Sequence, residues 1–195
     1  MAETETAAPK SMAVPLGAFA AGGVVALLLG IFGTVHDPSV DGTTMLWYDT
    51  VIGMKVAVSV VIGVLAIGQV VGALWIYGKL GIKAPSWLGI AHRISGTFAL
   101  LLAVFVGYHC IWVLGLQSGT VRNDYETFEV GARTVIHGVL GCVVFGAVVV
   151  KVVAVRSKRA PGWFLPLAGG LLFTLLMVVV FTSAGWYLTE KGWPS

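Results

Sequence analysis

Five long apolar stretches, separated by short polar segments, dominate the pattern of hydrophobic and polar positions along the chain. A helix needs roughly 20 apolar residues to cross a bilayer core about 30 Å thick, and each stretch reaches that length. The polar segments between them carry turn residues and are too short to form a second domain. The pattern predicts an all-α polytopic membrane bundle with five transmembrane helices, at residues 13–35, 51–77, 88–116, 130–155 and 164–188.

The ends of the chain differ in character from these apolar stretches. The leader MAETETAAPK is acidic, whereas a signal peptide begins with a basic segment. We therefore expect residues 1–11 to form a disordered cytoplasmic tail and the first helix to be retained. Residues 12–190 are expected to form one transmembrane domain, and residues 191–195 a short outer tail.

The lysines and arginines predict the orientation of the bundle. With the N-terminus inside, eight of the 12 basic residues fall on the inner side and four on the outer side. An excess of basic residues marks the cytoplasmic loops of membrane proteins. The distribution therefore predicts an N-in/C-out topology.

Composition excludes several classes of protein. Apolar residues make up 57% of the chain and charged residues 11%, whereas soluble domains carry about 25% charged residues. This balance excludes a soluble enzyme, a nucleic-acid-binding protein and a disordered protein. The net charge of only +3 is spread over the loops, so the expected partner is the lipid bilayer and not a nucleic acid.

Two histidines carry the main candidate chemistry, because ionisable groups inside a membrane span are costly and often functional. His109 lies seven residues before the expected end of the third span, and His137 lies seven residues after the start of the fourth. At 1.5 Å per residue, each is about 10 Å deep from the outer side. Successive antiparallel helices are normally neighbours, so we expect one imidazole from each at the same level of the outer leaflet.

Such a pair is what axial ligation of a b-type haem requires. Gly138 and Gly141 would supply a thin helix surface beside the macrocycle, and Arg133, four residues before His137, would meet the propionates. We therefore predict one haem b with His109 and His137 as iron ligands. The alternative is that both histidines form hydrogen bonds between helices without a metal.

The remaining histidines have weaker interpretations. His36, at the outer end of the first span, is the reserve ligand if one of the pair is wrong. His92, adjacent to Arg93 and near Ser95, could contact an anionic head group, a quinone or a haem propionate, or could be a wetted interfacial residue. Lys151 matches His92 in depth where a second haem would need a histidine, so only one haem is expected.

The two cysteines are expected to be packed free thiols. Cys110 and Cys142 differ in their expected depth by several residues, which argues against a disulfide.

The stretches AHRISG, YHCIW and RTVIHGVLG resemble small membrane cytochromes b, a group that includes the b561 type, ferric-reductase-like domains and the membrane anchors of succinate dehydrogenase. The HRISG stretch is similar to the HR-x-SG motif that lines the quinone site of those anchors, which implies a possible quinone contact. Gly89 stands where the anchors carry a serine. Nearly all of residues 11–190 also resembles an actinobacterial five-span family known only as a domain of unknown function, which implies a multi-pass protein of the bacterial plasma membrane.

Together these features predict an electron-transfer subunit rather than a self-contained enzyme. It would pass electrons between quinol or a membrane partner and an outer redox protein, within a complex of other redox or respiratory subunits. The main alternative is a haem-free membrane anchor or assembly subunit whose histidines are structural. A small transporter is a third reading, weakened by the shortage of acidic residues inside the spans.

Overall fold

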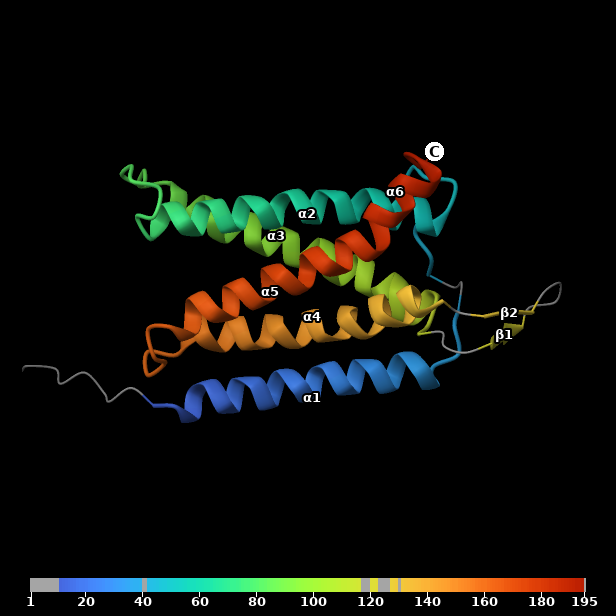
Figure 1. Cartoon of the computed structure of the whole chain (residues 1–195), viewed down its shortest axis with the longest axis horizontal. Coiled ribbons are helices and arrows are strands. Elements are labelled where there is room, and N and C mark those ends of the chain that lie inside the picture. The colour runs from blue at the N-terminus through green and yellow to red at the C-terminus, as the bar shows by residue number, and fades with distance from the viewer. Residues whose placement is uncertain (1–10, 40–41, 117–119, 123–126, 130, 195) are drawn as a thin grey trace, which may run out of the picture.

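Five long helices lie side by side and form the body of the computed structural model (Figure 1). The structure describes residues 11–39, 42–116, 120–122, 127–129 and 131–194, so residues 1–10 of the expected tail lie outside the described part. Each of the five helices is long and apolar enough to cross a membrane. Their bounds lie within three residues of the predicted stretches, and the all-α prediction is confirmed.

Two of the five helices contain a π-helical turn, and a short hairpin joins two others. The elements in chain order are α1 (Ala13–Val35), α2 (Val51–Ile76), α3 (Leu88–Tyr108), the π-turn η1 (His109–Val113), β1 (Thr120–Arg122), β2 (Thr127–Glu129), α4 (Ala132–Arg156), α5 (Phe164–Val180), the π-turn η2 (Phe181–Gly185) and α6 (Trp186–Lys191). Strands β1 and β2 pair antiparallel, with Thr120 opposite Glu129. The sequence analysis did not predict this hairpin.

Long apolar runs become helices because a backbone in lipid must satisfy its hydrogen bonds within its own segment. At the start of α2, the Thr50 hydroxyl oxygen accepts a hydrogen bond from the backbone N–H of Gly53 at 3.0 Å. After α2 and after η1 the chain turns through Gly78 (φ 69°) and Gly115 (φ 68°), a left-handed backbone region that glycine adopts without a steric penalty.

The helices pack in a chain of pairs, and η1 at the end of α3 also contacts α1 at one end of the bundle. Helix α1 packs on α4, α4 on α5, α5 on α2 and α2 on α3. In Figure 1, α1 and α4 lie at the bottom, α2 and α3 at the top, and α5 crosses between them. We call the right-hand end, where η1 and η2 lie, the His109 end, and the opposite end the His92 end.

Two buried clusters hold these pairs together. At the His92 end, Phe164 and Ala168 of α5 pack against Ala18 of α1 and Val150 of α4. Between α2 and α3, the fully buried Met54 packs with partly buried apolar side chains. The clusters leave much of α3 without a protein neighbour, since only a small share of that helix is buried.

Candidate functional site

His109 is the first residue of η1, and only 1% of its surface is exposed. Its Nδ1 atom lies 2.9 Å from the carbonyl oxygen of Phe105, one turn earlier in α3. A carbonyl oxygen only accepts, so Nδ1 carries the proton of the neutral ring. Nε2 then accepts a hydrogen bond from the backbone N–H of Thr44 at 3.2 Å. Both ring nitrogens are engaged, one by its own helix and one by the segment that precedes α2.

A run of aromatic rings surrounds His109. The Phe105 ring lies 4.6 Å from the imidazole and the Tyr108 ring 5.2 Å, measured between centroids. Tyr108 stacks at 6.4 Å on Trp112, whose ring lies 4.3 Å from that of His36. The reserve histidine therefore belongs to the same aromatic group, and its buried Nε2 has no hydrogen-bond partner among the described residues.

His137 lies in the second turn of α4 and is half-buried. Its Nδ1 is 3.3 Å from Oγ1 of Thr182 in η2. The Thr182 hydroxyl donates its single proton to the backbone oxygens of Val178 (2.8 Å) and Val179 (3.2 Å), so Oγ1 accepts from an Nδ1–H of His137. The ring is again held through Nδ1, and the lone pair is on Nε2.

Arg133 and His137 point toward the same residue of the neighbouring helix. The Arg133 guanidinium donates to the Thr182 carbonyl oxygen at 2.7 Å, and its central carbon lies 3.8 Å from the centre of the Trp186 ring. Such a cation–π contact adds about 0.5–2 kcal/mol of attraction. The four-residue spacing thus sets both side chains on the face of α4 that packs against α5 and η2.

The two candidate glycines differ in their surroundings. A Cβ atom added at Gly141, one turn beyond His137 on the same face, would find nothing within 4 Å. A Cβ atom at Gly138 would lie 3.0 Å from the Leu116 side chain. The expected thin surface exists at Gly141, whereas Leu116 already covers Gly138.

The third and fourth spans, which we expected to be neighbours, meet at one end only. Helix α3 packs on α2, and α4 packs between α1 and α5. The two helices approach each other only toward the His109 end, where Gly107 faces the Phe145 ring and Leu116 faces Gly138. His109 and His137 lie at this same end, but their hydrogen bonds go to different partners.

A second polar group joins α2 and α3 at the His92 end. The Gln69 side-chain Nε2 donates to the carbonyl oxygen of His92 at 3.0 Å and to the Ser95 hydroxyl oxygen at 2.7 Å. The His92 ring has a buried Nδ1 that finds no hydrogen-bond partner in the part of the chain that the structure describes. Its close approach to Gly72 of α2 shows that the ring faces α2. The sequence prediction did not include Gln69, although a polar side chain in mid-span is a signal for such a contact.

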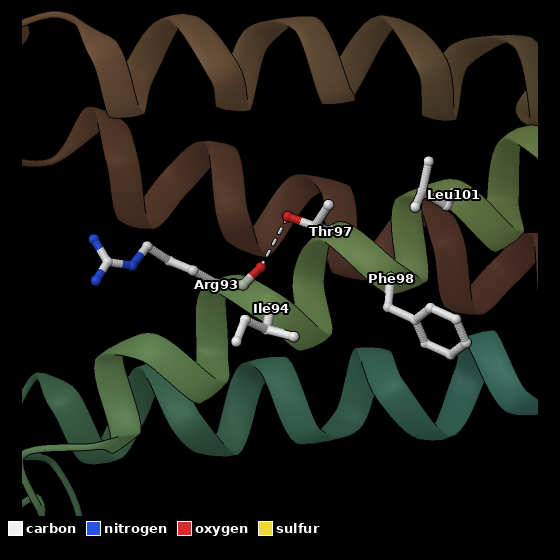
Figure 2. Close-up of a pocket in the computed structure, with 5 residues that line it drawn as sticks. All are labelled: Arg93, Ile94, Thr97, Phe98 and Leu101. Carbon is white, nitrogen blue, oxygen red and sulfur yellow. Dashed lines mark hydrogen bonds between the residues drawn. The ribbon is translucent and has the colours of Figure 1, made fainter.

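Arg93 points away from this group. Figure 2 shows its side chain on the outward face of α3, where it lines a shallow hollow with Ile94, Thr97, Phe98 and Leu101. The structure therefore brings His92 and Ser95 together through Gln69 and separates Arg93 from them. Arg93 is therefore placed where it suits a lipid head group, whereas His92 and Ser95 face the protein interior.

The cysteines lie closer than expected. Cys110 is in η1 and Cys142 in α4, both thiols are free, and each lies three residues from the contact between Gly107 and Phe145. The prediction of free thiols agrees with the structure, but the expected difference in depth is wrong because α3 and α4 meet with these two residues at one level.

Within the described ranges, no three histidine, cysteine, aspartate or glutamate side chains gather into a group that could hold a metal ion. Structural zinc sites need such groups, whereas haem iron takes one or two ligands from the protein. The finding concerns only a zinc-type site. It does not test haem ligation, for which the histidine pair remains the candidate.

Comparison with known proteins gives one match. The model of a family described as a family of unknown function, DUF6529, matches residues 12–195. No curated protein and no solved structure matches the chain.

Proposed function

The chain belongs to the DUF6529 family, whose function is unknown. From the residues of the chain itself, we propose that it is a membrane-embedded b-type cytochrome-like electron-transfer subunit. It binds one haem b through His109 and His137. The site lies near the outer leaflet, at the His109 end of the bundle.

The observation that carries this proposal is the shared hydrogen-bond pattern of the two imidazoles. Each ring donates Nδ1–H to an oxygen of the chain, which leaves the Nε2 lone pair for another partner. Metal-binding histidines typically show this pattern, because the second hydrogen bond fixes the tautomer and the ring orientation. Each ring also lies at a π-turn, His109 within η1 and His137 against η2, and π-turns occur frequently at functional sites.

Haem binding requires one exchange at His109. Its Nε2 would give up the hydrogen bond from the Thr44 N–H and bind iron instead, while the bond to Phe105 is kept. The net loss is about 1 kcal/mol for one hydrogen bond.

The neighbours of His137 suit a haem. Gly141 gives open space one turn deeper on the same face, and Arg133 brings a cation one turn nearer the helix start. A guanidinium has five N–H donors, of which the Thr182 carbonyl engages one. The remaining donors can meet a propionate carboxylate.

The basic residues support an N-in/C-out orientation in the bacterial plasma membrane, with the His109 end outside. On this orientation the subunit passes electrons between quinol or a membrane partner and an outer redox protein, within a complex of other redox or respiratory subunits. Arg93, His92 and Ser95 then lie toward the inner leaflet, where Arg93 contacts a lipid head group and a quinone is a possible ligand. A reporter fused after Ser195 should be active only outside the cytoplasm, and activity of a cytoplasmic reporter there would overturn the orientation.

The haem assignment is tested by measuring haem per chain in single variants. His109→Ala and His137→Ala should each remove the low-spin bis-histidine spectrum, because either change takes one axial ligand. His92→Ala, the matched control at the opposite end, should keep both the spectrum and the haem content. Unchanged spectra in the first two variants would overturn the ligand assignment.

One observation favours a second function, a haem-free membrane anchor or assembly subunit. Both ring nitrogens of the buried His109 already have hydrogen-bond partners within the chain, as a purely structural histidine would. On that function His109→Ala lowers stability in a protein that carries no haem. The haem content of the unmodified protein separates the two.

A further inference from the structure

Cys110 and Cys142 each lie three residues from the place where α3 and α4 meet, the contact of Gly107 with Phe145. The Phe145 ring packs on Gly107, so close that a Cβ atom at Gly107 would lie 2.6 Å from the ring carbon Cζ. The helices run in opposite directions, so three residues onward from Gly107 and three back from Phe145 lead to Cys110 and Cys142. Each step rises about 1.5 Å per residue, so the two cysteines share one level.

The surroundings of the thiols fit a pair that reacts with each other. Cys142 is buried, with 3% of its surface exposed, and Cys110 is half-buried. In the part of the chain that the structure describes, no third metal-binding side chain joins them, so they form a dithiol and not a metal site.

We propose that Cys110 and Cys142 are a redox modification site that closes into an intramolecular disulfide joining η1 to α4. This inference is independent of the haem. Two S–H bonds break and one S–S bond forms, and two electrons and two protons pass to an external thiol oxidant. An azo compound such as diamide accepts them as two new N–H bonds of a hydrazine.

The Phe145 ring controls this reaction. A disulfide needs Cα atoms about 4.4–6.8 Å apart, and a phenyl ring wedged between Gly107 and α4 limits how closely the helices approach. The closing bond would draw η1 toward α4. Because Cys110 directly follows His109, oxidation would also restrain the turn that carries this histidine.

The test uses the full chain in its membrane. After treatment with diamide, free thiols are blocked, disulfides are reduced, and the released thiols are counted by the mass added with a maleimide. The proposal predicts two released thiols per monomeric chain, and none in Cys110→Ser or Cys142→Ser. Two thiols that stay free, or a disulfide-linked dimer in place of the intramolecular bond, would overturn it.

Two further variants test the geometry even if a cysteine variant folds poorly. Phe145→Ala removes the ring and should speed oxidation several-fold, whereas Gly107→Val widens the contact and should slow it several-fold. Gly89→Val, on the same helix at a position with nothing within 4 Å, is the control and should oxidise like the unmodified protein. Equal rates in all four proteins would contradict the assigned register.

Discussion

Two faces of α4 use glycine in opposite ways. On one face, Gly146 meets Gly22 of α1 so closely that a Cβ atom at Gly22 would lie 2.5 Å from the Gly146 carbonyl oxygen. On another face, Gly141 has nothing within 4 Å of its missing Cβ atom, and it follows His137 and Arg133 at four-residue spacing. The first face is closed by another helix at the glycine itself, whereas the second packs against α5 and η2 but leaves space at Gly141.

One of the two glycine faces serves helix packing, and the other suits the proposed ligand. Small residues let membrane helices approach until their backbones touch, and Gly22 with Gly146 does this for α1 and α4. Gly141 serves no such contact within the chain. Its open space beside a histidine that is held through Nδ1 is what a flat ligand needs.

The largest effect is expected at the closed face. Gly22→Val places methyl groups against the Gly146 backbone, which cannot turn aside as a side chain can. Overpacking of this kind costs about 1–3 kcal/mol, so thermal unfolding in detergent should shift clearly downward. Gly23→Val, the neighbouring glycine with nothing within 4 Å, is the matched control and should unfold like the unmodified protein. Equal losses in both variants would show that α1 and α4 do not meet at Gly22.

At the Gly141 face, a substitution should change haem binding without lowering stability. A Cβ atom at Gly141 meets no atom of the described residues within 4 Å, and leucine favours a helix over glycine by up to about 1 kcal/mol, so the unfolding temperature of Gly141→Leu should hold or rise. The added side chain fills the proposed haem space, and haem content should fall to near zero. Gly23→Leu carries the same propensity change and should retain haem. Full haem content in Gly141→Leu would place the haem elsewhere.

A smaller effect is expected from the charge beside the open face. A nearby cation favours the reduced haem, because reduction adds negative charge, so Arg133→Gln should lower the midpoint potential. A partly screened charge contributes on the order of 1 kcal/mol, which corresponds to a few tens of millivolts. Potentiometric titration measures the shift, and Arg159→Gln at the opposite end is the control. A potential that moves no more than in the control would show that Arg133 lies away from the propionates.

The sequence predicted the helices well because crossing a bilayer imposes a length and an apolar composition on each one. It did not predict which helices are neighbours. Succession in the chain suggested that α3 lies along α4, but the glycine contact with α1 and the buried contacts with α5 occupy α4 instead. Which helices pack together depends on the shapes of side chains on several helices at once.

Parts of the candidate site could not be predicted from the sequence either. The spacing of Arg133 and His137 was enough to assign them one face, and both meet Thr182. One π-turn begins at His109 and the other contains Thr182. Each adds one residue to a helical turn, and no local sequence motif predicts it. The level of Cys110 opposite Cys142 follows from the contact of Gly107 with Phe145, which cannot be deduced from the sequence.

The most direct test of the central claim is the absorption spectrum of the purified, unmodified protein after expression with haem available, recorded oxidised and then reduced. The account predicts a low-spin b-type difference spectrum with split bands and one haem per chain, since iron would have two imidazole ligands. A colourless protein would contradict it and leave the histidines as structural hydrogen-bonding groups.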